Sequence, residues 1–206
     1  FPAFSKMQDD FARLRAAWLR AVRVLAAIVA PAMALLIALA PDIIPVVFGE
    51  KWTSAVPIVQ LLAFVGLQQS LMRFNSSVLQ AVGRADFLLR YALISATVCI
   101  SGFAVGLHWG VTGVAVSYTI TATLVAPVYL LFTTRSIEMR VGEFARNVAG
   151  ILGAALIVAL LAALARVGLE AAVPEATLRL IVILPLSGLL YVLLALVIVL
   201  TNITAL

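Results

Sequence analysis

Six long apolar runs dominate this sequence, and they restrict its fold more than any other feature. They lie at residues 21–48, 56–82, 87–107, 111–134, 148–165 and 178–200. An α-helix needs about 20 consecutive apolar residues to cross the hydrocarbon core of a bilayer. Because 65% of the chain is hydrophobic and only 11% is charged, against roughly 25% charged residues in soluble domains, water cannot be its main solvent. The sequence predicts an all-α, polytopic membrane protein with six transmembrane helices and short loops.

Proline and glycine set the expected interruptions of the first two runs. Pro31 lies inside the first run, where it predicts a kink that neighbouring groups tolerate in a membrane helix. Pro41 and Pro45 predict an irregular end to this run, with Gly49 as its stop. Gly83 closes the second run.

Basic residues are distributed unequally between the two sets of loops. The N-terminal segment and the loops after the second and fourth runs hold ten of them: Lys6, Arg13, Arg15, Arg20, Arg23, Arg84, Arg90, Arg135, Arg140 and Arg146. The opposite loops hold three: Lys51, Arg166 and Arg179. Short loops rich in Lys and Arg stay in the cytoplasm, so we expect both ends of this chain to be cytoplasmic. Topology then accounts for the basic residues, and no nucleic-acid partner is expected.

Two features predict contact with the cytoplasmic surface of the bilayer. Trp18 stands where an interfacial aromatic belt is expected. Residues 134–147 space Ile137, Val141 and Phe144 along one helical face with charges elsewhere, a pattern typical of a short interfacial amphipathic helix. We therefore take 134–147 as a linker between residues 1–133, which hold the lead-in and four helices, and residues 148–206, which hold a helix pair.

Most catalytic and metal-binding signatures are missing. His108 is the only histidine and Cys99 the only cysteine, so no His/Cys metal cluster can form within the sequence. The glycines at 110–116 lack the Lys-Ser/Thr that ends a phosphate-binding loop. We expect no catalytic residue, no metal, no cofactor and no enzymatic activity in this chain.

The second apolar run carries an unusual set of polar side chains. They are Gln68, Gln69, Arg73, Asn75, Ser76 and Gln80. On one continuous helix, Gln69, Arg73, Ser76 and Gln80 would form a single stripe. A charge at mid-membrane costs several kcal/mol, so this stripe should face protein or water. An alternative stays open, since Arg73 is about 15 Å from Gly83 and its side chain could extend toward the headgroups.

Five segments, in order, resemble one known family. They are "FPAFSKMQDD" at the start, "FGEKW" (48–52), "LLAFVGLQQS" (61–70), "VLQAVGRAD" (78–86) and "HWGVTGVAVSY" (108–118). This set resembles the polysaccharide exporters of the multidrug/oligosaccharidyl-lipid/polysaccharide flippase superfamily, in particular the colanic-acid and lipopolysaccharide exporters.

The resemblance implies a fragment of a larger flippase fold in the bacterial inner membrane. That fold has two six-helix bundles, and residues 1–133 would supply the last four helices of the second bundle, with 148–206 as an appended pair. The missing N-terminal half would be a partner. The substrate implied is an isoprenoid-pyrophosphate-linked oligosaccharide, moved across the bilayer by alternating access. Arg73 would then bind its anionic head, the polar stripe its sugars, and Arg84 and Arg90 would line the cytoplasmic mouth.

Two other functions remain open at this stage. A cation-coupled multidrug exporter of the same superfamily would need buried carboxylates, and Asp42 is the only acid in or near an apolar run. A membrane-embedded glycan polymerase or transferase would need a sizeable polar loop, which the sequence does not contain.

Overall fold

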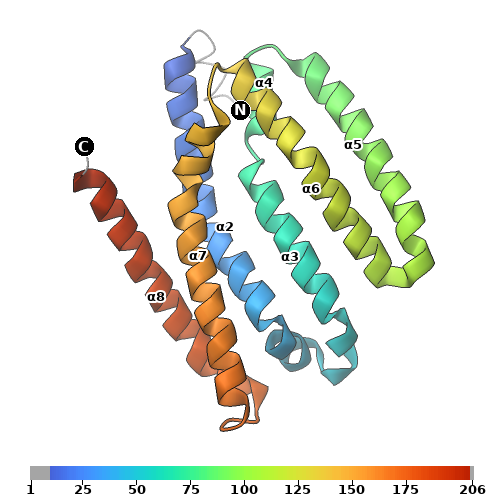
Figure 1. Cartoon of the computed structure of the whole chain (residues 1–206), viewed down its shortest axis with the longest axis vertical. Helices are drawn as coiled ribbons and strands as arrows, with labels where there is room; N and C mark the ends of the chain where they lie inside the picture. The colour runs from blue at the N-terminus through green and yellow to red at the C-terminus, as the bar shows by residue number, and fades with distance from the viewer. Residues whose placement is uncertain (1–9, 205–206) are drawn as a thin grey trace. The chain divides into compact units, whose positions relative to one another are not determined.

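Helices build the part of the chain that the structure describes. A computed structural model describes residues 10–204, with side chains up to residue 198, and contains no strand in that range. Its helices are α2 (Phe11–Phe48), η1 (Glu50–Ala55), α3 (Val56–Leu71), α4 (Asn75–Ala81), α5 (Ala85–Gly106), η2 (Leu107–Trp109), α6 (Gly110–Ser136), α7 (Val141–Glu170) and α8 (Ala176–Thr204) (Figure 1). The start of the predicted lead-in, with Lys6, lies outside the described residues.

The chain divides into two compact units, and each unit is discontinuous in sequence. The first unit comprises Phe1–Ala26 and Val65–Val148, and the second comprises Ala27–Phe64 and Ala149–Leu206. The predicted division into residues 1–133, 134–147 and 148–206 follows the chain instead, and it stays a prediction.

Five stretches of the described residues are long and apolar enough to cross a membrane. One of them, Ala85–Ser136, contains both α5 and α6. The chain is therefore a multi-pass membrane protein by length and composition of its helices, with five candidate spans where six apolar runs are counted in the sequence.

Residues 134–147 are shared between neighbouring helices rather than forming a helix of their own. They include the last turn of α6, a connection in which Glu138 has a φ of 52°, and the first turns of α7. Ile137 and Phe144 are buried, and Phe144 stacks on Trp18 with ring centroids 5.3 Å apart. Trp18 is fully buried, so its expected place in an interfacial belt is wrong: an aromatic partner on α7 covers the ring.

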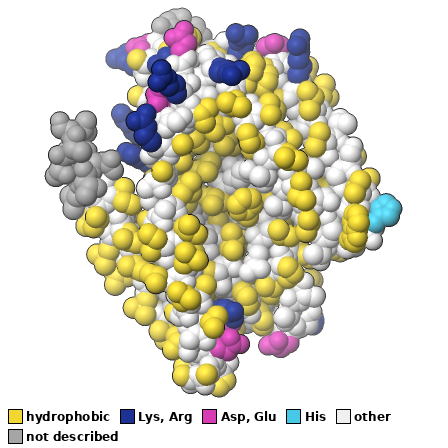
Figure 2. Space-filling view, in the orientation of Figure 1, with side chains coloured by type: hydrophobic (Ala, Val, Ile, Leu, Met, Phe, Trp, Pro, Cys, Tyr) yellow, Lys and Arg dark blue, Asp and Glu magenta, His cyan; other side chains and the backbone are white. Residues whose placement is uncertain are grey.

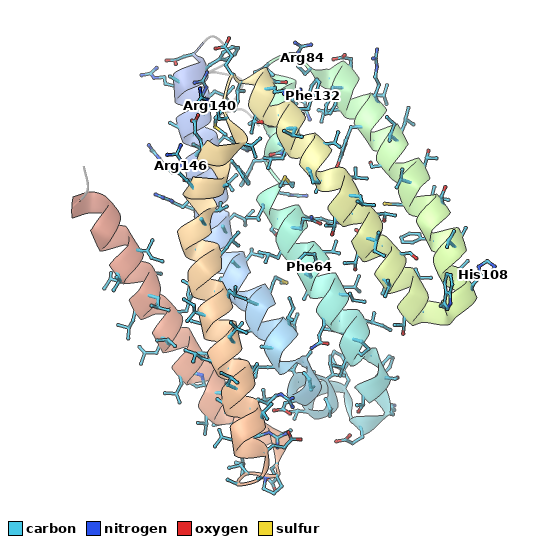
Figure 3. The ribbon with its side chains drawn as sticks, in the orientation of Figure 1. Phe64, Arg84, His108, Phe132, Arg140 and Arg146 are labelled. Carbon is cyan, nitrogen blue, oxygen red and sulfur yellow. The ribbon has the colours of Figure 1, made fainter. Side chains whose placement is uncertain are left out.

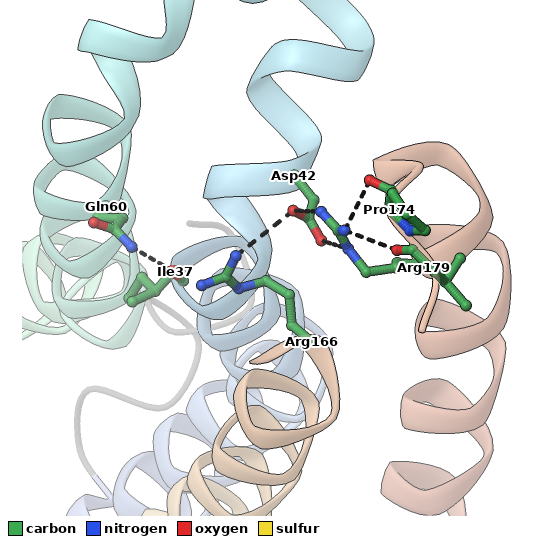
Figure 4. A network of polar contacts seen from close by, with 7 residues as sticks. Ile37, Asp42, Gln60, Arg166, Pro174 and Arg179 are labelled. Atoms are coloured by element: carbon green, nitrogen blue, oxygen red, sulfur yellow. Dashed lines mark hydrogen bonds and ion pairs between the residues drawn. The ribbon is translucent and has the colours of Figure 1, made fainter. Parts of the chain in front are cut away.

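Side-chain hydrogen bonds replace the backbone bonds that two prolines remove from α2. Proline has no N–H, so the carbonyl four residues earlier loses its helical partner. Pro31 thereby frees the carbonyl of Ala27, which accepts a hydrogen bond from the Tyr191 hydroxyl at 2.8 Å. Pro41 frees the carbonyl of Ile37, which accepts one from Gln60 Nε2 at 2.8 Å (Figure 4).

The expected irregular end of α2 is wrong, because the helix continues through Pro41 and Pro45 to Phe48. It ends where the sequence predicts, at Gly49, whose φ of 91° favours glycine.

A buried ion-pair network lies in the second unit (Figure 4). Asp42 is only 2% exposed. The Arg179 guanidinium binds its carboxylate through two hydrogen bonds, from Nη2 to Oδ1 at 2.7 Å and from Nε to Oδ2 at 3.1 Å. Arg179 Nη1 also donates to the carbonyls of Val173 and Pro174, and Arg166 lies 3.6 Å from the same carboxylate. Arg166 and Arg179, assigned to loops from the sequence, therefore belong to the helices α7 and α8.

A close contact between glycines joins α5 and α6 into an antiparallel hairpin in the first unit (Figure 1). A Cβ added at Gly106 would lie 2.7 Å from both the Gly113 carbonyl and the Ser117 hydroxyl. Gly110, with a φ of 69°, follows the short η2 and begins α6. Farther along the hairpin, the rings of Phe87 and Phe132 stack.

Removal of the Asp42 charge tests how strongly the ion-pair network stabilises the fold. Asp42→Asn would leave two guanidiniums without a counter-charge, and breaking such a buried pair costs about 3–5 kcal/mol. We expect a clear fall in the thermal unfolding midpoint of the intact protein in detergent. Glu175→Gln, at an exposed acid that forms no ion pair in the described residues, is the control. Equal midpoints for the two variants would contradict a stabilising role.

Gly106→Ala tests the contact inside the hairpin. The added methyl group must push α5 away from α6, and such overpacking costs about 1–3 kcal/mol. Gly168→Ala is the matched control, because a Cβ there meets nothing within 4 Å on a helix of similar length. We expect a lower unfolding midpoint only for Gly106→Ala. If the unfolding midpoint of Gly106→Ala equals that of Gly168→Ala, the hairpin accommodates the methyl group without losing stability.

Candidate functional site

A cavity of about 650 Å³ lies entirely within the first unit. Its lining combines polar, aromatic and small apolar residues: Leu25, Gly66, Gln68, Gln69, Ser70, Met72, Arg73, Ser76, Tyr91, Ser95, Cys99, Tyr118, Ala122, Val125, Ala126 and Tyr129. Ligand-binding cavities in proteins are commonly about 300–1,000 Å³. Arg73 is the only lining residue with a permanent charge, and none of them is acidic.

A break in the second apolar run carries Arg73. The predicted single helix over 56–82 is wrong, because α3 ends at Leu71 and α4 begins at Asn75. Between them the backbone hydrogen bonds span three residues instead of four. Met72 N donates to Gln69 O at 3.1 Å, and Arg73 N donates to Ser70 O at 3.2 Å. The Ser70 hydroxyl donates to the Gly66 carbonyl, the kind of local side-chain bond that competes with regular helix. The stripe from Gln69 to Gln80 is therefore not one continuous helical face.

The break nevertheless brings four of the predicted residues to the cavity. Gln68, Gln69, Arg73 and Ser76 line it, whereas Asn75 and Gln80 do not. Asn75 is fully buried, and its Nδ2 donates to Met72 Sδ at 3.3 Å. This bond connects the start of α4 to the break between the two helices. Gln80 is exposed near the end of α4.

The predicted mouth residues lie outside the lining of the cavity. Both are exposed: Arg84 directly precedes α5 (Figure 3), and Arg90 lies within its first turns. Their role, like that of the four lining residues, stays a prediction.

Three tyrosines complete the cavity, and sequence reasoning missed them. Tyr118 and Tyr129 come from α6 and Tyr91 from α5. Gln69 Nε2 donates to the Tyr118 hydroxyl at 2.6 Å, which connects α3 to α6 across the cavity. Tyr91 and Tyr129 stack with ring centroids 4.3 Å apart.

A weak sequence signal for these tyrosines exists. Tyr118, Ala122, Val125 and Tyr129 recur at i, i+4, i+7 and i+11, and Tyr91, Ser95 and Cys99 recur every four residues. The first set places two apolar side chains between two tyrosine rings on one helical face, and the second places Ser95 and Cys99 on the same face as one ring.

The cavity offers chemistry for an anionic and hydroxyl-rich ligand. Arginine presents a planar fork of donors that fits phosphate or carboxylate oxygens. Gln68 Oε1 is buried and lacks a hydrogen-bond donor among the described residues, so a ligand hydroxyl could supply one. No group of three or more His, Cys, Asp or Glu side chains forms in the described part of the chain. The lining thus offers a ligand one cation, amides, hydroxyls and aromatic rings.

Together, the long apolar helices and the cavity with its polar side chains define a multi-pass membrane protein with a candidate binding cavity between its helices. Comparisons with known proteins agree with this class. Residues 1–57 match the model of a family described as polysaccharide biosynthesis protein. No solved structure matches the chain significantly.

Three curated proteins are similar to this chain. It is 36% identical over 106 residues to the lipopolysaccharide biosynthesis protein WzxC of Escherichia coli, which covers 52% of the chain. It is 42% identical over 86 residues to the teichuronic acid biosynthesis protein TuaB of Bacillus subtilis, covering 42% of the chain. It is 33% identical over 121 residues, 58% of the chain, to an uncharacterized membrane protein in the cps region of Klebsiella pneumoniae.

These matches agree with the resemblance inferred from the sequence: the chain is similar to curated proteins of lipopolysaccharide and teichuronic acid biosynthesis. The aligned regions cover only 22%, 18% and 25% of the three relatives' lengths. The activity of the whole protein therefore belongs to the proposal below.

Cys99 allows a direct test of the cavity. It is the only cysteine among the 206 residues, and it is half-buried in the lining. In an intact protein with any other cysteine replaced, we expect Cys99 to react with small charged methanethiosulfonates. An anionic reagent should react faster than a cationic one, because Arg73 gives the cavity a positive potential, and Arg73→Gln should remove this preference.

The control places a cysteine on the same helix but away from the cavity. Leu93 is 62% exposed on α5 and is absent from the lining, so Leu93→Cys in a Cys99→Ser background should face lipid and react slowly with either reagent. Equal reaction rates at the two positions would mean that the cavity is closed to water.

Proposed function

We propose that this chain is part of an exporter that moves an isoprenoid-pyrophosphate-linked oligosaccharide across the bacterial inner membrane by alternating access. The observation that carries the proposal is an arginine without a counter-charge in a polar cavity between membrane-spanning helices. The names of the relatives, which refer to lipopolysaccharide and teichuronic acid biosynthesis, support a polysaccharide precursor as substrate.

The electrostatics of the cavity favour an anionic ligand. None of the ion pairs between described residues includes Arg73. A cationic side chain far from water is costly in a membrane unless water or an anion compensates it. Arg73 is exposed toward the cavity side and the lining contains no acid, so an anionic ligand can supply the counter-charge. A pyrophosphate fits, because the guanidinium can bind two of its oxygens at once.

The remaining lining residues suit the carbohydrate part of such a substrate. Gln68 and Gln69 offer amide donors and acceptors, and Ser76 and the tyrosines offer hydroxyls. Sugar hydroxyls need many partners of this kind once they leave water. The exposed faces of tyrosine rings can also pack against the apolar face of a sugar ring.

The topology proposed for this exporter has six crossings and both ends in the cytoplasm. The hairpin turn at η2 and Gly110 supports counting α5 and α6 as separate crossings. Because Asp42 binds Arg166 and Arg179, Lys51 is the only basic residue of the opposite loops left outside an ion pair of the described residues. This strengthens the charge asymmetry behind the predicted orientation. In this proposal, an N-terminal half of the exporter would complete the transport path.

The two other functions find less support. A cation-coupled drug exporter needs a carboxylate that can exchange its cation during transport. Asp42 is instead held by two arginines in the second unit and does not line the cavity. A glycan polymerase or transferase needs a base close to its substrate. His108 is exposed in η2 and is not part of the lining (Figure 3).

Export measurements on Arg73 variants of the intact protein test the proposal. Arg73→Ala should reduce export more than tenfold at normal protein levels, because a lost charged contact exceeds about 1.4 kcal/mol. Arg73→Lys should retain part of the activity, since it keeps the charge without the fork. Arg135→Ala, which removes an exposed arginine from the last turn of α6, should export normally.

The same variants distinguish substrate binding from a purely structural role. If Arg73 only extends toward lipid headgroups, Arg73→Ala will lower the amount or stability of the protein but not the export per molecule. Normal export by Arg73→Ala would refute the proposed function of the cavity.

A further inference from the structure

A second basic cluster lies outside the cavity, where α2 and α7 begin. Its members, here called the α2–α7 arginine cluster, are Arg20, Arg23 and Arg146, and all three are exposed. Figure 2 shows Lys and Arg side chains gathered at the end of the molecule where α2 begins, and Figure 3 labels Arg146 in the first turns of α7.

The cluster is not neutralised by acids of the described chain. Two neighbouring arginines do have carboxylate partners: Arg13 lies 3.7 Å from Asp10, and Arg15 lies 3.5 Å from Glu138. The ion pairs between described residues include none of the three cluster arginines. They therefore present an unbalanced positive charge on the surface.

Contacts beneath the cluster hold its two helices together within the first unit. Asn147 Nδ2 donates to the Leu19 carbonyl at 2.9 Å, and Arg23 Nε lies 3.5 Å from the Asn147 carbonyl. The stacked and buried rings of Trp18 and Phe144 also pack α2 against α7. These contacts hold the two helices together, and no hydrogen bond among the described residues uses the outer guanidinium nitrogens of Arg23 and Arg146.

The sequence of α2 places the cluster at a boundary between charged and apolar surface. Residues 24–41 contain no charged side chain, whereas residues 13–23 contain four arginines. Val24 follows Arg20 by four residues, so it lies on the same face, and it is 58% exposed. A molecule bound here would meet guanidiniums at one end and an exposed aliphatic surface below them.

We propose that the α2–α7 arginine cluster binds the headgroup of an anionic phospholipid. The guanidinium N–H groups donate to the phosphodiester oxygens, and the acyl chains lie along the apolar face of α2 that starts at Val24. A zwitterionic lipid carries its own cation beside the phosphate and gains less from an unbalanced positive surface. This site is separate from the cavity and does not depend on the exported substrate.

Lipid-binding measurements on the intact, detergent-purified protein test the site. Native mass spectrometry is used to titrate phosphatidylglycerol and phosphatidylcholine separately. We expect tighter binding of phosphatidylglycerol, and about a fivefold loss of its apparent affinity for each arginine replaced in Arg20→Gln, Arg23→Gln and Arg146→Gln. Binding of phosphatidylcholine should not change.

A matched triple variant controls for overall charge. Arg84→Gln, Arg90→Gln and Arg135→Gln together remove three exposed arginines from outside the cluster, and this variant should keep the wild-type affinity for phosphatidylglycerol. An equal loss in both triple variants would overturn the site, because it would indicate diffuse attraction only. Inorganic phosphate that displaces phosphatidylglycerol at equal concentration would overturn the lipid assignment in favour of a phosphate site. If the cluster variant unfolds, the single replacement Arg20→Gln provides the same comparison.

Discussion

The backbone of a chain that crosses hydrocarbon must satisfy its own polar groups, and this requirement explains the unusual α2. Three prolines stand inside one 38-residue helix, where each would interrupt a helix in water. Tyr191 and Gln60 donate hydrogen bonds to the carbonyls that Pro31 and Pro41 release. Tyr191 on α8 and Gln60 on α3 therefore have a clear structural role, even though each looks isolated in apolar sequence. Polar residues in such helices have to be judged by their partners.

The same test separates the arginines of this chain. Arg179 lies in a helix of the second unit and has a complete set of partners: a carboxylate held by two bonds, and two carbonyls. Its function is to stabilise the packing of that unit. Arg73 lies beside a cavity and forms no ion pair in the described residues. A guanidinium that is fully bound cannot take a ligand, whereas one that is left free can. This difference in partners, rather than the presence of arginine, is the reason to propose that the cavity binds a ligand.

The sequence predicted the elements of this fold better than their contacts. Apolar length alone located the long helices, and glycine placed the ends near Gly49 and Gly83. The sequence did not predict the break at residues 72–74. Serine and asparagine side chains disturb a helix only where they form local hydrogen bonds, as Ser70 does. Sequence reasoning also missed Tyr91, Tyr118 and Tyr129. Their helices are apolar on all sides, so no contrast between faces shows which side is inward. Polar stripes are visible in such sequences, whereas the spacing of the tyrosines gives only a weak signal.

The first unit combines two basic features with different surroundings. Arg73 is placed among amides, hydroxyls and tyrosine rings in a cavity of about 650 Å³, which suits a ligand with many hydroxyl groups. Arg20 and Arg146 are exposed beside aliphatic surface, which suits a ligand with acyl chains. A lipid-linked oligosaccharide has both kinds of group, so an exporter of such a substrate has to keep bulk anionic lipid away from its cavity. In this proposal, membrane lipid binds outside the cavity and the anionic sugar carrier binds inside it. The residues that surround each phosphate would then distinguish the two ligands.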